Sequence, residues 1–244
     1  MNTSGKYINS TEETENEINQ LNTQIHSKSG CEHFNLSITQ PNPSKLELWL
    51  KNKEEPVSHV MIGCEYAECA NNALRITTTT EPPYQRQNYN KFLTAIVIII
   101  ASSLIDKKGE SFMQIVDYTT IKARMKVLQK YVIYKTDALE LDPMSQEEKD
   151  IEINKPDGDG LFSIYIPLFD ENMETHLNQE IAWKVIHALL EDNKNGIMCS
   201  RTNRGGKKIG AGLHQASRPS AACGISCWLR PAPYTKVSTL PVIC

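Results

Sequence analysis

The sequence lacks three features that would place the protein in a membrane or outside the cell. Met1–Thr23 is mostly Asn, Thr, Ser and Glu, so it has no apolar core of the kind that signal peptides carry. The longest apolar run, Phe92–Ile105, has 14 residues, whereas a membrane-spanning helix needs about 20. The seven cysteines are odd in number and unevenly spread, which does not fit a disulfide framework. These absences predict a cytoplasmic protein without membrane attachment.

Acidic residues are absent from 201–244, a segment that holds seven of the 26 Lys and Arg. Residues 1–200 therefore contain 19 basic and 29 acidic residues. A basic segment of this kind is either an arm for nucleic acid or an acidic partner, or a flexible extension foreign to the domain. The change from an Asn-, Lys- and Ile-rich body to a Gly-, Ala-, Pro- and Arg-rich tail favours the extension. The formal net charge of -3 also argues against a dedicated nucleic-acid binder.

Apolar and polar residues alternate from Phe34 onward, which is typical of strands with one buried face. Strands are expected at 34–38, 46–50, 57–66, 73–80, 112–116 and 161–168, with turns at 52–56 and 71–72. Because the first four strands are joined by short polar turns, they predict an antiparallel meander. Pro82 and Pro83 are expected to end the fourth strand, since neither can donate to a strand ladder.

Apolar residues at helical spacing predict the remaining elements. The run from Phe92 to Leu104 keeps helical spacing despite its β-branched residues, so we expect a helix that is buried on all sides. Further helices are expected at Thr120–Tyr134 and Thr175–Asn193. A short helix is expected at Thr11–Ile25, begun by a capping box of Ser10 and Glu13. It either docks a protein partner or is a marginal helix that lies on its own domain or frays.

These elements predict an α+β fold with a mixed, mostly antiparallel sheet flanked by helices. The expected organisation is a polar N-terminal segment (1–33), one domain (34–168), a C-terminal helix packed on that domain (169–199) and a flexible basic tail (200–244).

The segment from Thr79 to Leu93 carries the chemistry. A polar loop that leaves a strand and opens an apolar helix places unbonded N–H groups at the helix N-terminus. Together with the helix dipole, these donors form a site suited to phosphate groups. Arg86 and Lys91 add positive charge there.

This segment resembles the GNAT superfamily of N-acetyltransferases, in which Gln/Arg-x-x-Gly-x-Gly/Ala follows a strand and opens a helix. Gln85 stands at the first position, Tyr84 at the preceding aromatic and Leu93 on the helix. The resemblance implies a GNAT-like fold and an acetyl-CoA-dependent N-acyltransferase acting on a small-molecule or peptide amine. The loop would bind the pyrophosphate and the preceding strand the pantetheine arm. The residues implied in acetyl-CoA binding are Thr78, Thr79, Gln85, Arg86, Gln87, Asn88, Tyr89, Asn90 and Thr120.

The chain departs from the family pattern at several positions. Asn88 and Asn90 replace the two glycines, and Val127 stands where the family has a Tyr that protonates the departing thiolate. Tyr131, one helical turn further on, is the candidate acid, and Glu65 is the candidate base. These departures leave an alternative open, in which the fold is kept as an inactive binding or structural module.

A metal site is not expected. Cys31-x-His33 and Cys223-x-x-x-Cys227 do not form a recognised four-ligand zinc set.

Overall fold

The structure is a computed structural model that describes residues 7–28, 30–67, 70–119, 122–136, 143–155, 162–170 and 174–191. The predicted basic tail at 200–244 and the predicted ligand residue Thr120 lie outside these residues.

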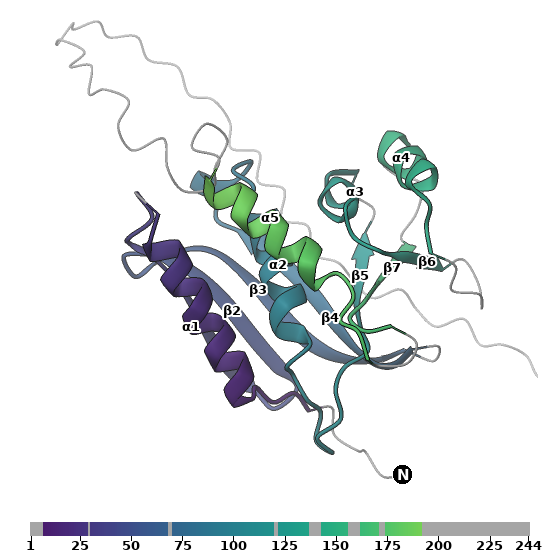
Figure 1. The fold of residues 1–244 in the computed structure, drawn as a ribbon, viewed down its shortest axis with the longest axis horizontal. Helices are drawn as coiled ribbons and strands as arrows, with labels where there is room; N and C mark the ends of the chain where they lie inside the picture. Colours follow the sequence, from purple (N-terminus) through teal and green to yellow (C-terminus); the bar gives the residue numbers. More distant parts are fainter. Residues whose placement is uncertain are drawn as a thin grey trace, which may run out of the picture. The chain divides into compact units, whose positions relative to one another are not determined.

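The described strands form one seven-stranded sheet in the order β1-β2-β3-β4-β5-β7-β6 (Figure 1). They are β1 (Phe34–Asn42), β2 (Lys45–Asn52), β3 (Glu55–Ala67), β4 (Ala70–Thr80), β5 (Gln114–Thr119), β6 (Tyr134–Thr136) and β7 (Phe162–Pro167). Only β4 and β5 pair in parallel; every other neighbouring pair in this sheet is antiparallel. The predicted mixed, mostly antiparallel sheet is therefore confirmed.

The two predicted hairpin turns have different outcomes. The turn at 52–56 is confirmed, with positive φ at both Lys53 (53°) and Glu54 (73°), as a two-residue hairpin turn of the primed type requires. The turn at Asn71–Asn72 is wrong, because both residues belong to β4. Ala70, which precedes both residues, already pairs with Ala67 of β3. That register buries Leu74 and Ile76, and this burial outweighs the turn preference of Asn.

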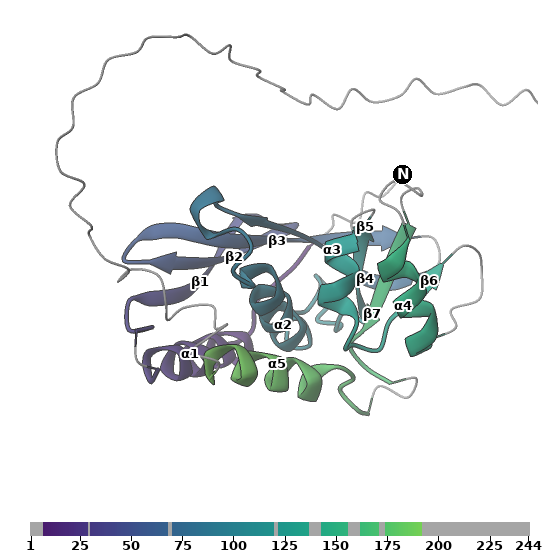
Figure 2. The same cartoon turned by 90° about the horizontal axis from the view of Figure 1, so that it is seen from above.

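Helix α2 (Tyr89–Ala101) is the central helix of the core. It lies between the sheet on one side and α1 (Glu12–His26) and α5 (Gln179–Glu191) on the other (Figure 2). Every residue from Phe92 to Ala101 is buried. The predicted all-round apolar helix is confirmed. Burying apolar side chains on every side of the helix stabilises it by more than the low helix propensity of its β-branched residues destabilises it. Within the ranges given above, every helix falls short of the length and hydrophobicity that a membrane span requires.

Helix α1 packs on its own domain. Its predicted stripe of Ile18, Leu21 and Ile25 is buried in the core shared with the sheet and α2. The capping box, however, is formed by Thr11 and Thr14 and not by Ser10 and Glu13. The Thr14 hydroxyl also lies 2.8 Å from the Ser103 hydroxyl after α2, so the cap is joined to a tertiary contact.

The predicted helix at Thr120–Tyr134 is too long. Helix α3 spans Lys122–Leu128, Tyr131 lies in a turn, and Tyr134 begins β6. A helix that the sequence did not predict, α4 (Gln146–Asn154), contributes to this break. Its buried Lys149 donates from Nζ to the Tyr131 carbonyl oxygen at 2.6 Å, which holds the turn in place.

Candidate functional site

A cleft opens where β4 and β5 separate. The two strands pair through Ala73–Gln114, Leu74–Ile115 and Arg75–Val116. Beyond this point Asp117 continues along β7, opposite Ile164, while β4 runs on beside β3 to Thr80. The cleft has a volume of about 760 Å³. Its lining comes from β4 (Ile76, Thr77, Thr78, Thr80), the following loop and α2 (Tyr84, Gln85, Arg86, Asn88, Tyr89, Asn90, Lys91), β5 (Asp117) and α3 (Ala123, Arg124, Lys126, Val127).

The loop between β4 and α2 is sharply bent. After a 3-10 turn at Pro82–Tyr84, Arg86 and Asn88 both have positive φ. Asn tolerates this left-handed conformation better than most residues. The chain therefore adopts a left-handed bend at Asn88 without a glycine there.

The N-terminus of α2 faces this cleft without a side-chain cap. Asn88 is the N-cap residue, but its side chain makes no capping hydrogen bond. Asn90 and Lys91 of the first helical turn, whose N–H groups precede the first N–H that bonds along the helix, line the cleft. This arrangement, with the positive end of the helix dipole, suits an anionic group.

Positive charge dominates the lining of the cleft. Arg86, Lys91, Arg124 and Lys126 contribute cations, and among the described lining residues only Asp117 is acidic. Burial, and then the charge of Lys130, lower the pKa of Lys91. A bound anion would offset both effects, since an opposite charge favours the ammonium form.

Thr78 on β4 lines the cleft, but its hydroxyl is buried. Its hydroxyl oxygen is buried and has no hydrogen-bond partner among the described residues. Buried hydroxyls are usually bonded, but this oxygen is closed off from the cleft that other atoms of Thr78 line.

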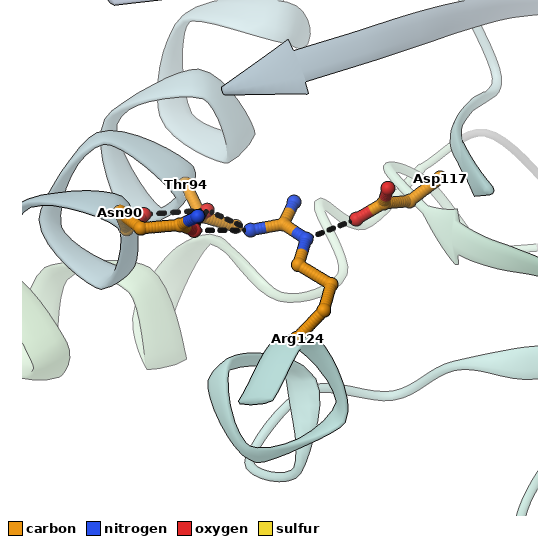
Figure 3. A network of polar contacts seen from close by, with 4 residues as sticks. All are labelled: Asn90, Thr94, Asp117 and Arg124. Atoms are coloured by element: carbon orange, nitrogen blue, oxygen red, sulfur yellow. Dashed lines mark hydrogen bonds and ion pairs between the residues drawn. The ribbon is translucent and has the colours of Figure 1, made fainter. Parts of the chain in front are cut away.

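Arg124 joins three elements at the inner wall of the cleft (Figure 3). Its Nε donates to the carboxylate of Asp117, and its Nη1 donates to Asn90 Oδ1 at 2.5 Å and to Thr94 Oγ1 at 2.7 Å. The side chains of Arg124 and Asp117 are only 10% and 8% exposed. Burial raises the pKa of Asp117, and the guanidinium opposes that rise. The side-chain amide of Asn90 is thereby held against Arg124.

The structure brings together most of the predicted cofactor-binding residues. Those that line the cleft are Thr78, Gln85, Arg86, Asn88, Tyr89 and Asn90. Thr79 is exposed and is not among the lining residues. Gln87 is not among them either, and its side-chain amide donates to the Pro83 carbonyl at 3.0 Å.

The two predicted catalytic residues are placed differently. Tyr131 is 1% exposed and belongs to the hydrophobic core, not to the cleft lining. Its hydroxyl has no partner among the described residues, and burial raises its pKa. Glu65 lies on β3 opposite Ala73, and the structure describes the backbone of this residue but not its side chain.

Sequence reasoning missed Arg124, Asp117 and Lys126. Their contacts with the cleft depend on how β5 and α3 pack beside α2, and no local pattern marks them. Cys31 and His33 belong to no metal site that the described residues form, since these contain no cluster of three His, Cys, Asp or Glu side chains able to hold an ion.

No protein-family model matches the sequence, and no curated protein matches it. Solved structures of N-acetyltransferases are similar to the chain. The GNAT domain of PAT from S. lividans is 9% identical over 66% of this chain and 89% of that chain, with a TM-score of 0.36. An acetyltransferase of the GNAT family from Streptococcus pneumoniae is 8% identical over 66% and 97%, with a TM-score of 0.33. Spermidine N-acetyltransferase from Vibrio cholerae, in complex with CoA and spermine, is 10% identical over 66% and 94%, with a TM-score of 0.34. Values this low establish neither a substrate nor an activity for this chain.

Proposed function

We propose that the protein is a cytoplasmic enzyme that binds acetyl-CoA in the cleft and transfers the acyl group to an amine. The observation that carries the proposal is the uncapped N-terminus of α2 beside the diverging strands β4 and β5. Coenzyme A combines a diphosphate with a long, narrow arm. The N-terminus of α2 suits the diphosphate, and the open edge of β4 from Ile76 to Thr80 suits the arm, which can hydrogen-bond along a strand.

The proposed reaction begins with an unprotonated amine attacking the thioester carbonyl. A C–N bond forms, the C–S bond breaks, and the electron pair leaves on the thiolate. The amine nitrogen loses a proton and the thiolate gains one. Holding the thioester and the amine in contact supplies much of the rate. Glu65 as base and Tyr131 as acid remain predictions.

The burial of Tyr131 favours a second candidate function. A tyrosine in the core, away from the cleft lining, is poorly placed to protonate a thiolate. The second candidate is therefore a protein that binds CoA or a partner without transferring an acyl group. Binding without turnover would distinguish it from the first.

Isothermal titration of the full chain with acetyl-CoA tests the proposal. We expect saturable one-to-one binding that weakens as salt is added, because anionic phosphates meet Arg86 and Lys91. Arg86→Gln should weaken binding, and Lys184→Gln, on the exposed face of α5, should not. Absence of binding at about 1 mM ligand, a free energy near -4 kcal/mol, would contradict the proposal. Release of free thiol with a panel of amines then separates the enzyme from the binding protein.

A further inference from the structure

Arg124 has donors that the described residues do not use. A guanidinium carries five N–H groups. Three of them are taken, by Asp117, Asn90 and Thr94. Figure 3 draws no contact from the remaining terminal nitrogen, Nη2, to Asp117, Asn90 or Thr94.

This unused nitrogen belongs to a residue that is buried and fixed. The side chain of Arg124 is 10% exposed, yet it lines the cleft. Contacts to β5 and to two turns of α2 hold the guanidinium plane in one orientation. Nη2 is not among the fully buried, unpartnered side-chain atoms of the described residues, and Arg124 lines the cleft, so its N–H groups are available to an acceptor on a ligand there.

Arg124 lies at the inner end of the cleft. Asp117 directly follows Val116, the last β5 residue paired with β4. Thr94 lies about 6 Å along α2 beyond Asn90, at 1.5 Å per residue. The loop that receives the diphosphate follows Thr80, five residues or about 16 Å from the last paired residue of β4, Arg75. A ligand with its diphosphate at the loop therefore brings the other end of its arm toward Arg124.

We infer that Nη2 of Arg124 donates a hydrogen bond to the carbonyl oxygen of the acyl thioester, an inference that rests on the proposed function. Asp117 already neutralises the guanidinium, so a neutral carbonyl fits this position better than a second carboxylate does. As the amine attacks, negative charge develops on that oxygen. A donor already fixed by Asp117, Asn90 and Thr94 stabilises this charge without reorganisation.

Acetyl-CoA and CoA form a matched pair of probes, because only the first has the carbonyl. The double variant Asp117→Asn with Arg124→Met removes the donor without leaving a buried charge unpaired. Arg124→Lys is the second variant, since it keeps a cation for Asp117 but loses the planar guanidinium with its separate terminal nitrogens. Near-ultraviolet circular dichroism of each variant checks its tertiary packing.

We expect both variants to lose about tenfold in affinity for acetyl-CoA and less than about twofold for CoA, the difference expected for one charge-assisted hydrogen bond. The carbon-13 resonance of acetyl-CoA labelled at the carbonyl should move to higher frequency on binding to the natural chain and move less with either variant. Equal losses for both ligands, or a carbonyl resonance that the variants leave unchanged, would show that Arg124 only braces α3, and would overturn the inference while the proposed function stands. If the natural chain binds neither ligand, both fail.

Discussion

Arg86 and Asn88 both have a left-handed backbone, with φ of 62° and 63°, on either side of Gln87. Non-glycine residues lose roughly 1–2 kcal/mol in this conformation, and Asn loses less than most. The loop thus bends here without any glycine, and the bend brings the N-terminus of α2 to the cleft.

Substitutions at Asn88 test this bend. Asn88→Ala should lower the free energy of unfolding by about 1 kcal/mol, because alanine lacks the local hydrogen bonding that eases positive φ. Asn88→Gly should change it by less than about 0.5 kcal/mol, since glycine accepts this φ but adds freedom to the unfolded chain. Urea unfolding measures both. Equal stability of the alanine and glycine variants would mean that the bend is not fixed.

The central position of α2 makes a stability prediction. Ile96 is completely buried, so Ile96→Ala should lower the free energy of unfolding by about 2–5 kcal/mol. Ile151 on α4 is 53% exposed, and Ile151→Ala should stay within about 0.5 kcal/mol of the natural chain. Similar losses at both positions in urea unfolding would contradict the packing of α2.

The sequence predicted the fold wherever one face or every face of an element is buried. The spacing of Phe92, Ile96 and Ile100 identified a covered helix, and Leu46, Leu48 and Leu50 a strand with one buried face. It failed where a short element depends on tertiary contacts. Helix α4 begins with a capping box of Ser145 and Glu148, but its sparse apolar residues left the segment unassigned.

The site was predicted in part for the same reason. The loop from Gln85 to Asn90 has a local signal, a polar stretch between a strand and an apolar helix, and most of it lines the cleft. Arg124 has no such signal, because its role depends on Asp117 and Thr94 from other elements. Tyr131 was placed on a helix by extending an apolar stripe beyond Leu128, where the chain in fact turns.

Glu17 on α1 predicts a pH dependence of stability. Burial raises its pKa to about 7, with a smaller contribution from Glu13, and the Ser103 hydroxyl, which donates to Glu17 at 3.0 Å, opposes the rise. Between about pH 4.5 and 7 the folded chain binds a proton that the unfolded chain releases. The free energy of unfolding should therefore fall as pH rises through this window and level off above it.

Glu17→Gln should remove this part of the fall, because the amide stays neutral throughout and its oxygen can still accept from Ser103. Glu15→Gln, on the exposed side of the same helix, should keep it. Thermal unfolding of the three proteins at about pH 5 and pH 8 makes the comparison. Parallel curves for the natural chain and Glu17→Gln would contradict the prediction.

Asn178 predicts a large stability loss at the start of α5. Its side chain is bonded to the Val132 N–H at 2.7 Å, to the Val132 carbonyl at 3.0 Å and to the Pro167 carbonyl at 3.0 Å. Asn178→Ala leaves these buried and part-buried backbone groups without a partner and places alanine at a φ of 66°, which together should cost about 2–4 kcal/mol. Asn154→Ala, at an exposed position of α4 with one bond to Asp150, is the control. Near-equal unfolding midpoints for the two variants would be the contrary result.

The most direct test of the cleft as an acyl-CoA site is a titration of the nitrogen-15-labelled full chain with CoA, followed through its backbone amide resonances. We predict that the resonances of Asn90 and Lys91 in the first turn of α2 move most, together with those of Thr78 and Arg124. Resonances that stay in place up to about 1 mM CoA, or that move only on α4 and the exposed face of α5, would contradict the account.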